Sequence, residues 1–178
     1  RPFFYPLTFF IALVVIYLVC GIFDVLPLPP QSIHFWAQAD RASVAALFYH
    51  EGMDFFHPRT YNLINGTGYT GMEFPLINFL AACLYKVFGF HHFWYRFLVL
   101  CIVSAGAVAA FKIAAEMLIN KWVALFLTLL WILSPVILFY APNCLADAAS
   151  MGFIMITWLA FFRLKNHFSF GWLFILFI

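Results

Sequence analysis

Charged residues are scarce in this chain. Only 9% of its 178 residues are Asp, Glu, Lys or Arg, whereas 66% are hydrophobic and 22% are aromatic, and the mean hydropathy is +1.00. Soluble domains carry about 25% charged residues, so the composition excludes an ordinary soluble protein and predicts an all-α polytopic membrane protein. A net charge of +2 gives no indication that the partner is a nucleic acid.

Two further features that the sequence lacks exclude other kinds of site. The four cysteines lack the close spacing of a metal knot or of a secreted disulfide framework, and we expect them to be buried and inert: Cys20, Cys83, Cys101 and Cys144. The glycine-rich segment NLINGTGYTGME, residues 62–73, follows no predicted strand and lacks the Lys-Ser/Thr pair of a phosphate-binding loop. A nucleotide site there is therefore excluded.

Long apolar runs predict the membrane-spanning helices. We expect spans at residues 3–23, 94–115, 122–140, 145–162 and 168–178, the last of them truncated. The run 75–88 has only fourteen residues, too few to cross a bilayer about 30 Å thick, and is predicted to lie at the membrane interface. The chain is expected to be the N-terminal part of one larger transmembrane domain.

The basic residues predict the orientation. If 75–88 does not span, then Arg1, the turn 112–121 and the pair Arg163 and Lys165 all fall on one side of the membrane. The positive-inside rule assigns that side to the cytoplasm. The outer loop 24–93 and the turn 140–147 then share the extracytoplasmic face, which predicts a multi-pass protein of the inner (plasma) membrane.

The outer loop holds most of the acidic residues. Within it, residues 35–51 are predicted to form an amphipathic interfacial helix that ends at Gly52. One face of this helix should carry Trp36, Asp40, Val44 and Leu47, and other faces Gln38, Arg41 and Tyr49. An acid on an apolar face is costly unless it is paired or functional. We weigh an ion pair of Asp40 with Arg41 or Arg59 against a catalytic role.

Two further acids stand at helix starts. Glu73 precedes Pro75, the predicted first residue of the helix 75–88, and Asp147 lies in the first turn of the span 145–162. Acids are common at such positions because they complement the helix dipole. The alternative is that both face the same outer cavity as Asp40, where Glu73 would bind a divalent cation or sugar hydroxyls.

Four segments in this order resemble the N-terminal half of GT-C type membrane glycosyltransferases, such as protein O-mannosyltransferases and the aminoarabinose transferases that modify lipid A. They are WAQADRASVAALFYHEG around Asp40, FFHPR at 55–59, GYTGMEFPL around Glu73, and PNCLADAAS around Asp147. The chain departs from the mannosyltransferases in having Arg41 after Asp40. It departs from the aminoarabinose transferases in having Phe-Pro-Leu after Glu73.

The resemblance implies an inverting transferase. It would move a sugar from a polyprenyl-phosphate donor to a glycan, lipid or protein acceptor in the cell envelope, with Asp40 as general base on the acceptor. The residues implied in substrate binding are Glu73, Asp147, Arg41, Arg59, His57 and Tyr69. The charge of the leaving phosphate would be met by Arg59, by Arg41, or by a divalent metal cation held partly by Glu73.

Two other classes of protein are alternatives to a transferase. A transporter or flippase would use intramembrane acids, but the predicted spans are nearly free of charge at their centres. A non-catalytic accessory subunit would use the aromatic surface to pack against its partners.

Overall fold

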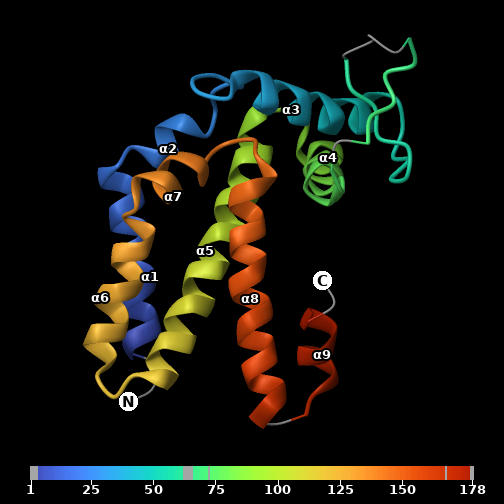
Figure 1. The fold of residues 1–178 in the computed structure, drawn as a ribbon. Coiled ribbons are helices and arrows are strands. Elements are labelled where there is room, and N and C mark those ends of the chain that lie inside the picture. The colour runs from blue at the N-terminus through green and yellow to red at the C-terminus, as the bar shows by residue number, and fades with distance from the viewer. Residues whose placement is uncertain (1–3, 62–65, 72, 167, 177–178) are drawn as a thin grey trace. The chain divides into compact units, whose positions relative to one another are not determined.

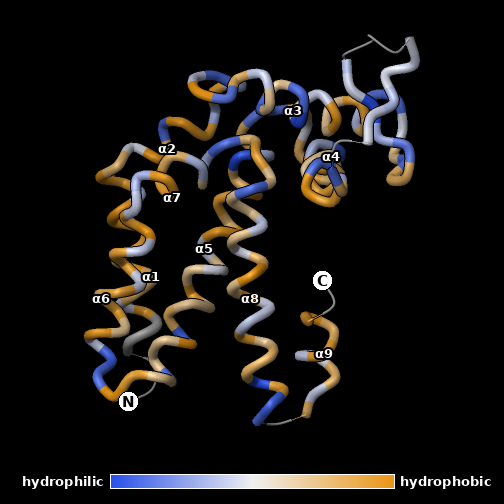
Figure 2. Tube along the Cα trace, viewed as in Figure 1, coloured by the Kyte–Doolittle hydropathy of each residue, from blue (hydrophilic) through white to orange (hydrophobic). Residues whose placement is uncertain are grey.

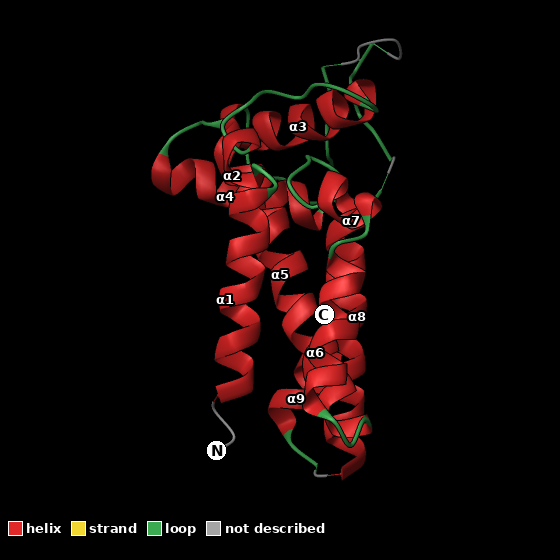
Figure 3. Cartoon of the chain, turned by 90° about the vertical axis from the view of Figure 1, so that its left-hand side faces the viewer, coloured by secondary structure: helices red, strands yellow, loops and turns green. Residues whose placement is uncertain are grey.

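The computed structural model describes residues 4–61, 66–71, 73–166 and 168–176 of the chain (Figure 1). Within these residues the secondary structure consists of helices and loops (Figure 3), which confirms the all-α expectation. The helices are α1 Phe4–Val19, α2 Ile22–Val25, α3 Phe35–His50, α4 Leu76–Phe88, α5 His92–Met117, α6 Lys121–Ile132, α7 Pro135–Tyr140, α8 Ala146–Asn166 and α9 Phe170–Leu176.

The chain divides into two compact units. Unit 1 comprises Arg1–Ile22, Leu100–Ala141 and Asp147–Ile178, and unit 2 comprises Phe23–Val99 and Pro142–Ala146. Unit 1 therefore holds α1, α6, α7, α9 and most of α5 and α8. Unit 2 holds α3, α4 and the long loop that joins them.

Among the described residues, two helices have the length and composition to cross a membrane. They are α5, with 26 residues, and α8, with 21 residues. At 1.5 Å per residue they extend about 39 Å and about 31 Å, enough for the hydrocarbon core of a bilayer. The helices α1, α4 and α6 are apolar but shorter, and Figure 2 shows the hydrophobic colouring of α1 and α6.

Two of the predicted spans are broken by local backbone chemistry. The segment expected to be one helix over 3–23 is divided into α1 and α2 at Gly21, whose φ of 65° only glycine adopts readily. The segment expected to be one helix over 122–140 is divided into α6 and α7 at Ser134–Pro135. Proline has no N–H to continue the helical hydrogen bonds, and it begins α7 instead.

Unit 1 packs its helices through aromatic and small residues. The rings of Phe9 on α1 and Phe111 on α5 stack at 5.0 Å, and the Tyr17 and Ser104 hydroxyls are 3.1 Å apart. Many large apolar side chains point outward instead of inward, among them Phe10, Ile11, Val15, Leu18, Phe126, Leu127 and Leu130. Exposed apolar surface on this scale is unusual for a soluble monomer.

Glycine allows α5 and α8 to approach each other closely. A β-carbon at Gly106 would lie 2.5 Å from the Cα of Gly152, and one at Gly152 would lie 2.6 Å from the carbonyl oxygen of Ile102. Both distances are shorter than atoms tolerate. Small residues at such crossings are typical of helices that pack within membranes.

We therefore expect Gly106→Ala to destabilise the protein by about 1–3 kcal/mol, because the added methyl group forces the two backbones apart. Thermal unfolding in detergent would measure the effect. Gly171→Ala is the matched control, since a β-carbon there meets only the Ser169 hydroxyl at 3.7 Å. Equal melting temperatures for the two variants would contradict the assignment.

Candidate functional site

The helices α3 and α4 of unit 2 pack through a small apolar core. Val44 and Phe48 of α3 lie against Ala82 of α4, and Phe79 and Met53 cover them. The predicted helix 35–51 is present as α3, one residue shorter, and Gly52 follows with a φ of 147°. The predicted helix 75–88 is present as α4, with Pro75 as its N-cap.

The predicted faces of α3 are confirmed in part. Val44 and Leu47 are buried as expected, but Trp36 is 78% exposed and Gln38 is completely buried. Gln38 has polar partners that the helical pattern cannot reveal. Its side-chain amide donates to the carbonyls of Gln31 and Ile33 and lies 3.5 Å from an Arg96 nitrogen.

Asp40 is half-buried in the middle of α3. Its backbone carbonyl accepts a 2.6 Å bond from the Ser43 hydroxyl, which lies 2.9 Å from the Thr60 hydroxyl of the loop. Among the described residues, no side chain pairs with the Asp40 carboxylate. The considered ion pair with Arg41 or Arg59 is therefore not formed in the described part of the chain.

Arg41 pairs with Glu73 instead. Its Nε donates to Oε1 at 2.7 Å and its Nη2 to Oε2 at 3.0 Å, so the two planar groups meet in a bidentate pair. The two side chains are 17% and 25% exposed, which shields the pair from water in part. This ion pair ties α3 to the loop segment just before α4.

The Glu73 carboxylate does not fit the metal site that the sequence suggested. Both of its oxygens accept from a guanidinium, whose positive charge opposes a cation at the same place. In the described ranges, no group of three or more His, Cys, Asp or Glu side chains could hold a metal ion. We derive no chemical step from a metal.

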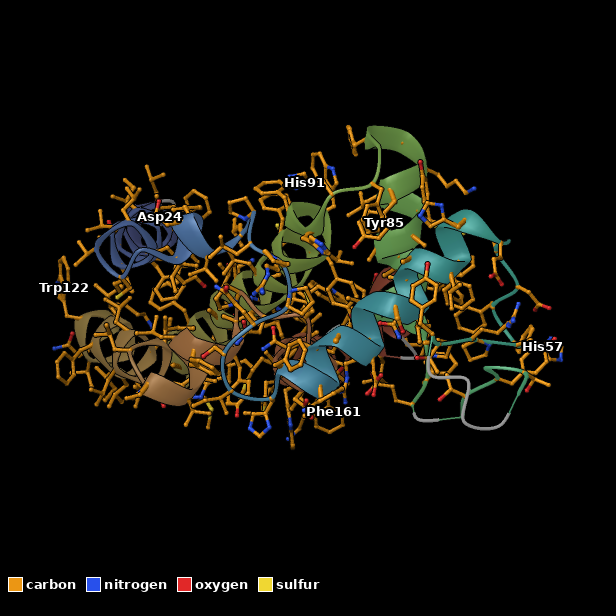
Figure 4. The ribbon with its side chains drawn as sticks, turned by 90° about the horizontal axis from the view of Figure 1, so that it is seen from above. Asp24, His57, Tyr85, His91, Trp122 and Phe161 are labelled. Atoms are coloured by element: carbon orange, nitrogen blue, oxygen red, sulfur yellow. The ribbon has the colours of Figure 1, made fainter. Side chains whose placement is uncertain are left out.

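Arg59, His57 and Tyr69 lie together in the loop between α3 and α4. They line a pocket of about 130 Å³ with Glu51, Gly52 and Asp54 of the loop, and with Leu47 and Phe48 of α3. Arg59 donates to Glu51 and lies over the Tyr69 ring at 5.6 Å, while His57 Nδ1 is 2.9 Å from Asp54. Figure 4 labels His57 on this loop and Tyr85 on α4.

An antiparallel bridge holds two segments of the loop backbone in register. Arg59 and Tyr69 form the bridge, flanked by a 2.8 Å bond from the Thr60 amide to the Gly68 carbonyl. Residues 62–65, part of the segment examined for a phosphate-binding loop, lie outside the described residues. The bridge fixes Arg59 and Tyr69 side by side at the pocket.

Asp147 belongs to unit 1. It lies exposed in the first turn of α8, as predicted, where an acid complements the helix dipole. Because Asp40 and Glu73 belong to unit 2, a shared cavity for the three acids stays a prediction.

Arg96 of α5 is a buried residue that caps backbone carbonyls. Although fully buried, it donates to the carbonyls of Leu28, Pro29 and Pro142 at 2.7–2.9 Å and to the Asn143 side chain at 2.8 Å. It thereby holds the proline-rich segment after α2 and the turn before α8 in one place.

Burial also changes two protonation equilibria in unit 2. Removal from water raises the pKa of the Cys144 thiol to about 11, with the positive charge of Arg96 opposing the shift. Burial likewise raises the pKa of the Tyr85 hydroxyl, to which Cys144 adds a smaller rise. Both groups stay neutral at physiological pH, so neither supplies a nucleophile there.

Comparison with known proteins found no family model that matches the chain, no matching curated protein and no matching solved structure.

We expect Arg96→Lys to lower the stability of the protein. A lysine cannot reproduce the five-donor fork, and each hydrogen bond lost to a charged donor costs about 1.5–3 kcal/mol. Thermal unfolding in detergent would measure the loss. Arg163→Lys is the control because Arg163 is about 41% exposed and pairs only with Glu116 among the described residues, so its effect should stay within about 1 kcal/mol. A larger effect for Arg163→Lys would overturn this ranking.

We also expect Cys144 to react slowly in the folded protein. With the other three cysteines replaced by serine, its reaction with a maleimide at pH 8 should be about tenfold or more slower in the folded protein than after denaturation in SDS, because the folded thiol is completely buried and its pKa is raised. Equal rates in the two states would contradict the burial of this thiol.

Proposed function

We propose that this chain is part of a membrane glycosyltransferase. It would transfer a sugar, with inversion, from a polyprenyl-phosphate donor to an envelope glycan, lipid or protein acceptor. The proposal rests on a difference among the acids of the loop in whether each has a basic partner. Glu73, Glu51 and Asp54 each have a basic partner, whereas the half-buried Asp40 has none in the described residues.

An uncommitted carboxylate is what a general base requires. A base must accept a proton from the substrate, and a carboxylate already held by a guanidinium is less able to do so. In the proposed step Asp40 takes the proton of the acceptor hydroxyl or amine. The acceptor atom bonds to the anomeric carbon as the bond from that carbon to the phosphate oxygen breaks, and the lipid phosphate leaves with the electron pair.

The leaving phosphate needs positive charge nearby. Arg59 and Arg41 are the candidates in unit 2, and Arg41 follows Asp40 directly on α3. Both guanidiniums are held by acids in the ligand-free chain, Arg59 by Glu51 and Arg41 by Glu73. We therefore propose that donor binding shifts one of these pairs. His57 and Tyr69 would contact the sugar or the acceptor from the pocket beside Arg59.

The membrane setting of the proposal rests on the helices. Two helices could span a bilayer by length and composition, and α1 and α6 expose apolar side chains in numbers that a bilayer accommodates. We propose a multi-pass protein of the inner (plasma) membrane with Asp40, Glu73 and Asp147 on its extracytoplasmic face. The lysines and arginines near residues 112–121 and 163–165 would then face the cytoplasm.

The decisive variant is Asp40→Asn. It keeps the shape of the side chain and removes its ability to accept a proton, so we expect the rate of sugar transfer to fall about 10²- to 10⁴-fold. The measurement is glycoconjugate synthesis in cells that lack the gene and carry the variant, together with the level of the polyprenyl-linked donor, which should accumulate.

Asp24→Asn is the matched control for this experiment. It makes the same charge change at an exposed acid of α2 and should leave synthesis at the wild-type level. Both variants must be inserted and expressed like the wild type. Full activity of Asp40→Asn would contradict the assignment of Asp40 as the general base and would favour a transport or accessory role.

A further inference from the structure

Unit 1 contains a polar cavity that the proposed reaction does not use. It has a volume of about 420 Å³ and is lined by Lys112 of α5, by Leu159, Arg163 and Asn166 of α8, and by Trp172 of α9. Its volume falls in the range of about 300–1,000 Å³ that small-molecule sites occupy. Two cationic side chains, an amide and an indole N–H make it a site of hydrogen-bond donors.

The side chain of Glu116 and two backbone carbonyls at the C-terminal end of α5 already have basic partners. Glu116 accepts a hydrogen bond from Arg163. Lys121 donates to the carbonyls of Ala115 and Leu118, at the C-terminal end of α5. The charge of Lys112 is therefore not needed to pair with Glu116 or to cap these carbonyls.

Lys112 itself has no hydrogen-bond or ion-pair partner among the residues that the structure describes. The same holds, within those residues, for the N–H groups of Arg163 other than the one on Glu116. An unpaired ammonium and a partly free guanidinium in the lining of one cavity favour an anion with several oxygens, such as a phosphate.

Apolar side chains stand close to the cavity residues in the sequence. Phe168 and Phe170 precede Trp172 and are 71% and 80% exposed, and Met117 and Ile119 follow Lys112 at the end of α5 and are also exposed. Figure 2 shows the C-terminal end of α8 as a hydrophilic stretch on a largely hydrophobic helix. A phosphate attached to acyl chains matches this combination better than a free phosphate, because the chains would cover the exposed rings.

We propose that this cavity binds the phosphate headgroup of an anionic phospholipid. Lys112 and Arg163 contact the phosphate oxygens, and Asn166 and the Trp172 indole supply further donors to the headgroup. Basic pockets between membrane helices on the cytoplasmic side recognise such lipids in this way. The proposal requires the chain to lie in a bilayer, but it does not depend on glycosyl transfer or on Asp40.

The test is lipid binding to the purified protein in detergent, followed by native mass spectrometry with phosphatidylglycerol and phosphatidylcholine. The wild type should bind phosphatidylglycerol more tightly. Lys112→Gln should weaken phosphatidylglycerol binding about fivefold or more and weaken phosphatidylcholine binding less, because the choline cation offsets the phosphate charge. Equal phosphatidylglycerol affinity for wild type and Lys112→Gln would overturn the proposal.

Two controls separate this site from general attraction to a basic surface. Lys165→Gln removes the same charge from a residue at the C-terminal end of α8 that does not line the cavity, and it should bind phosphatidylglycerol like the wild type. An equal loss of phosphatidylglycerol binding in both variants would overturn a defined site.

Competition with inorganic phosphate tests whether the ligand is a lipid. Millimolar inorganic phosphate should not displace the lipid, and displacement would identify a soluble anion as the ligand instead. Unchanged melting temperatures of both variants in phosphatidylcholine would exclude misfolding as the cause of a loss.

Discussion

The buried guanidinium of Arg96 is the interaction on which unit 2 depends most. A charge removed from water is tolerated only when its donors are satisfied, and here backbone carbonyls from two distant segments, with the side chain of Asn143, satisfy them. Proline supplies part of this arrangement, because Pro29 and Pro142 have carbonyls to offer and no N–H of their own to satisfy. No buried side-chain nitrogen or oxygen lacks a partner in the described residues, so the cost of burying Arg96 is met locally.

Charged residues are scarce in this chain, and this scarcity explains how the charges of unit 2 are distributed. Three of the acids in the loop 24–93 hold a basic side chain, namely Glu51, Asp54 and Glu73. These bonds give shape to a segment that has little apolar material of its own. Arg41–Glu73 joins a helix to the residues before the next helix, and Glu51–Arg59 closes the loop onto the end of α3. Asp40 differs from these three acids because, within the described residues, no side chain pairs with its carboxylate.

Hydropathy and helix-ending residues were enough to predict where most helices lie. The helices at 35–50 and 76–88 were predicted to within a residue, because Gly52 and Pro75 act through the local backbone. The breaks at Gly21 and Ser134–Pro135 were missed, since an apolar run hides them from a count of hydrophobic residues. The burial of Gln38 and the pairing of Arg41 with Glu73 could not be read from the sequence. Both depend on partners between 5 and 58 residues away, whose approach is set by the path of the chain.

The contact between Gly106 and Gly152 has a mechanical consequence for unit 1. Two backbones that touch without intervening side chains interlock at one point and leave the remainder of each helix to be spaced by larger residues. A larger side chain at either glycine would therefore change the separation of α5 and α8, and with it the packing of every side chain between the two helices.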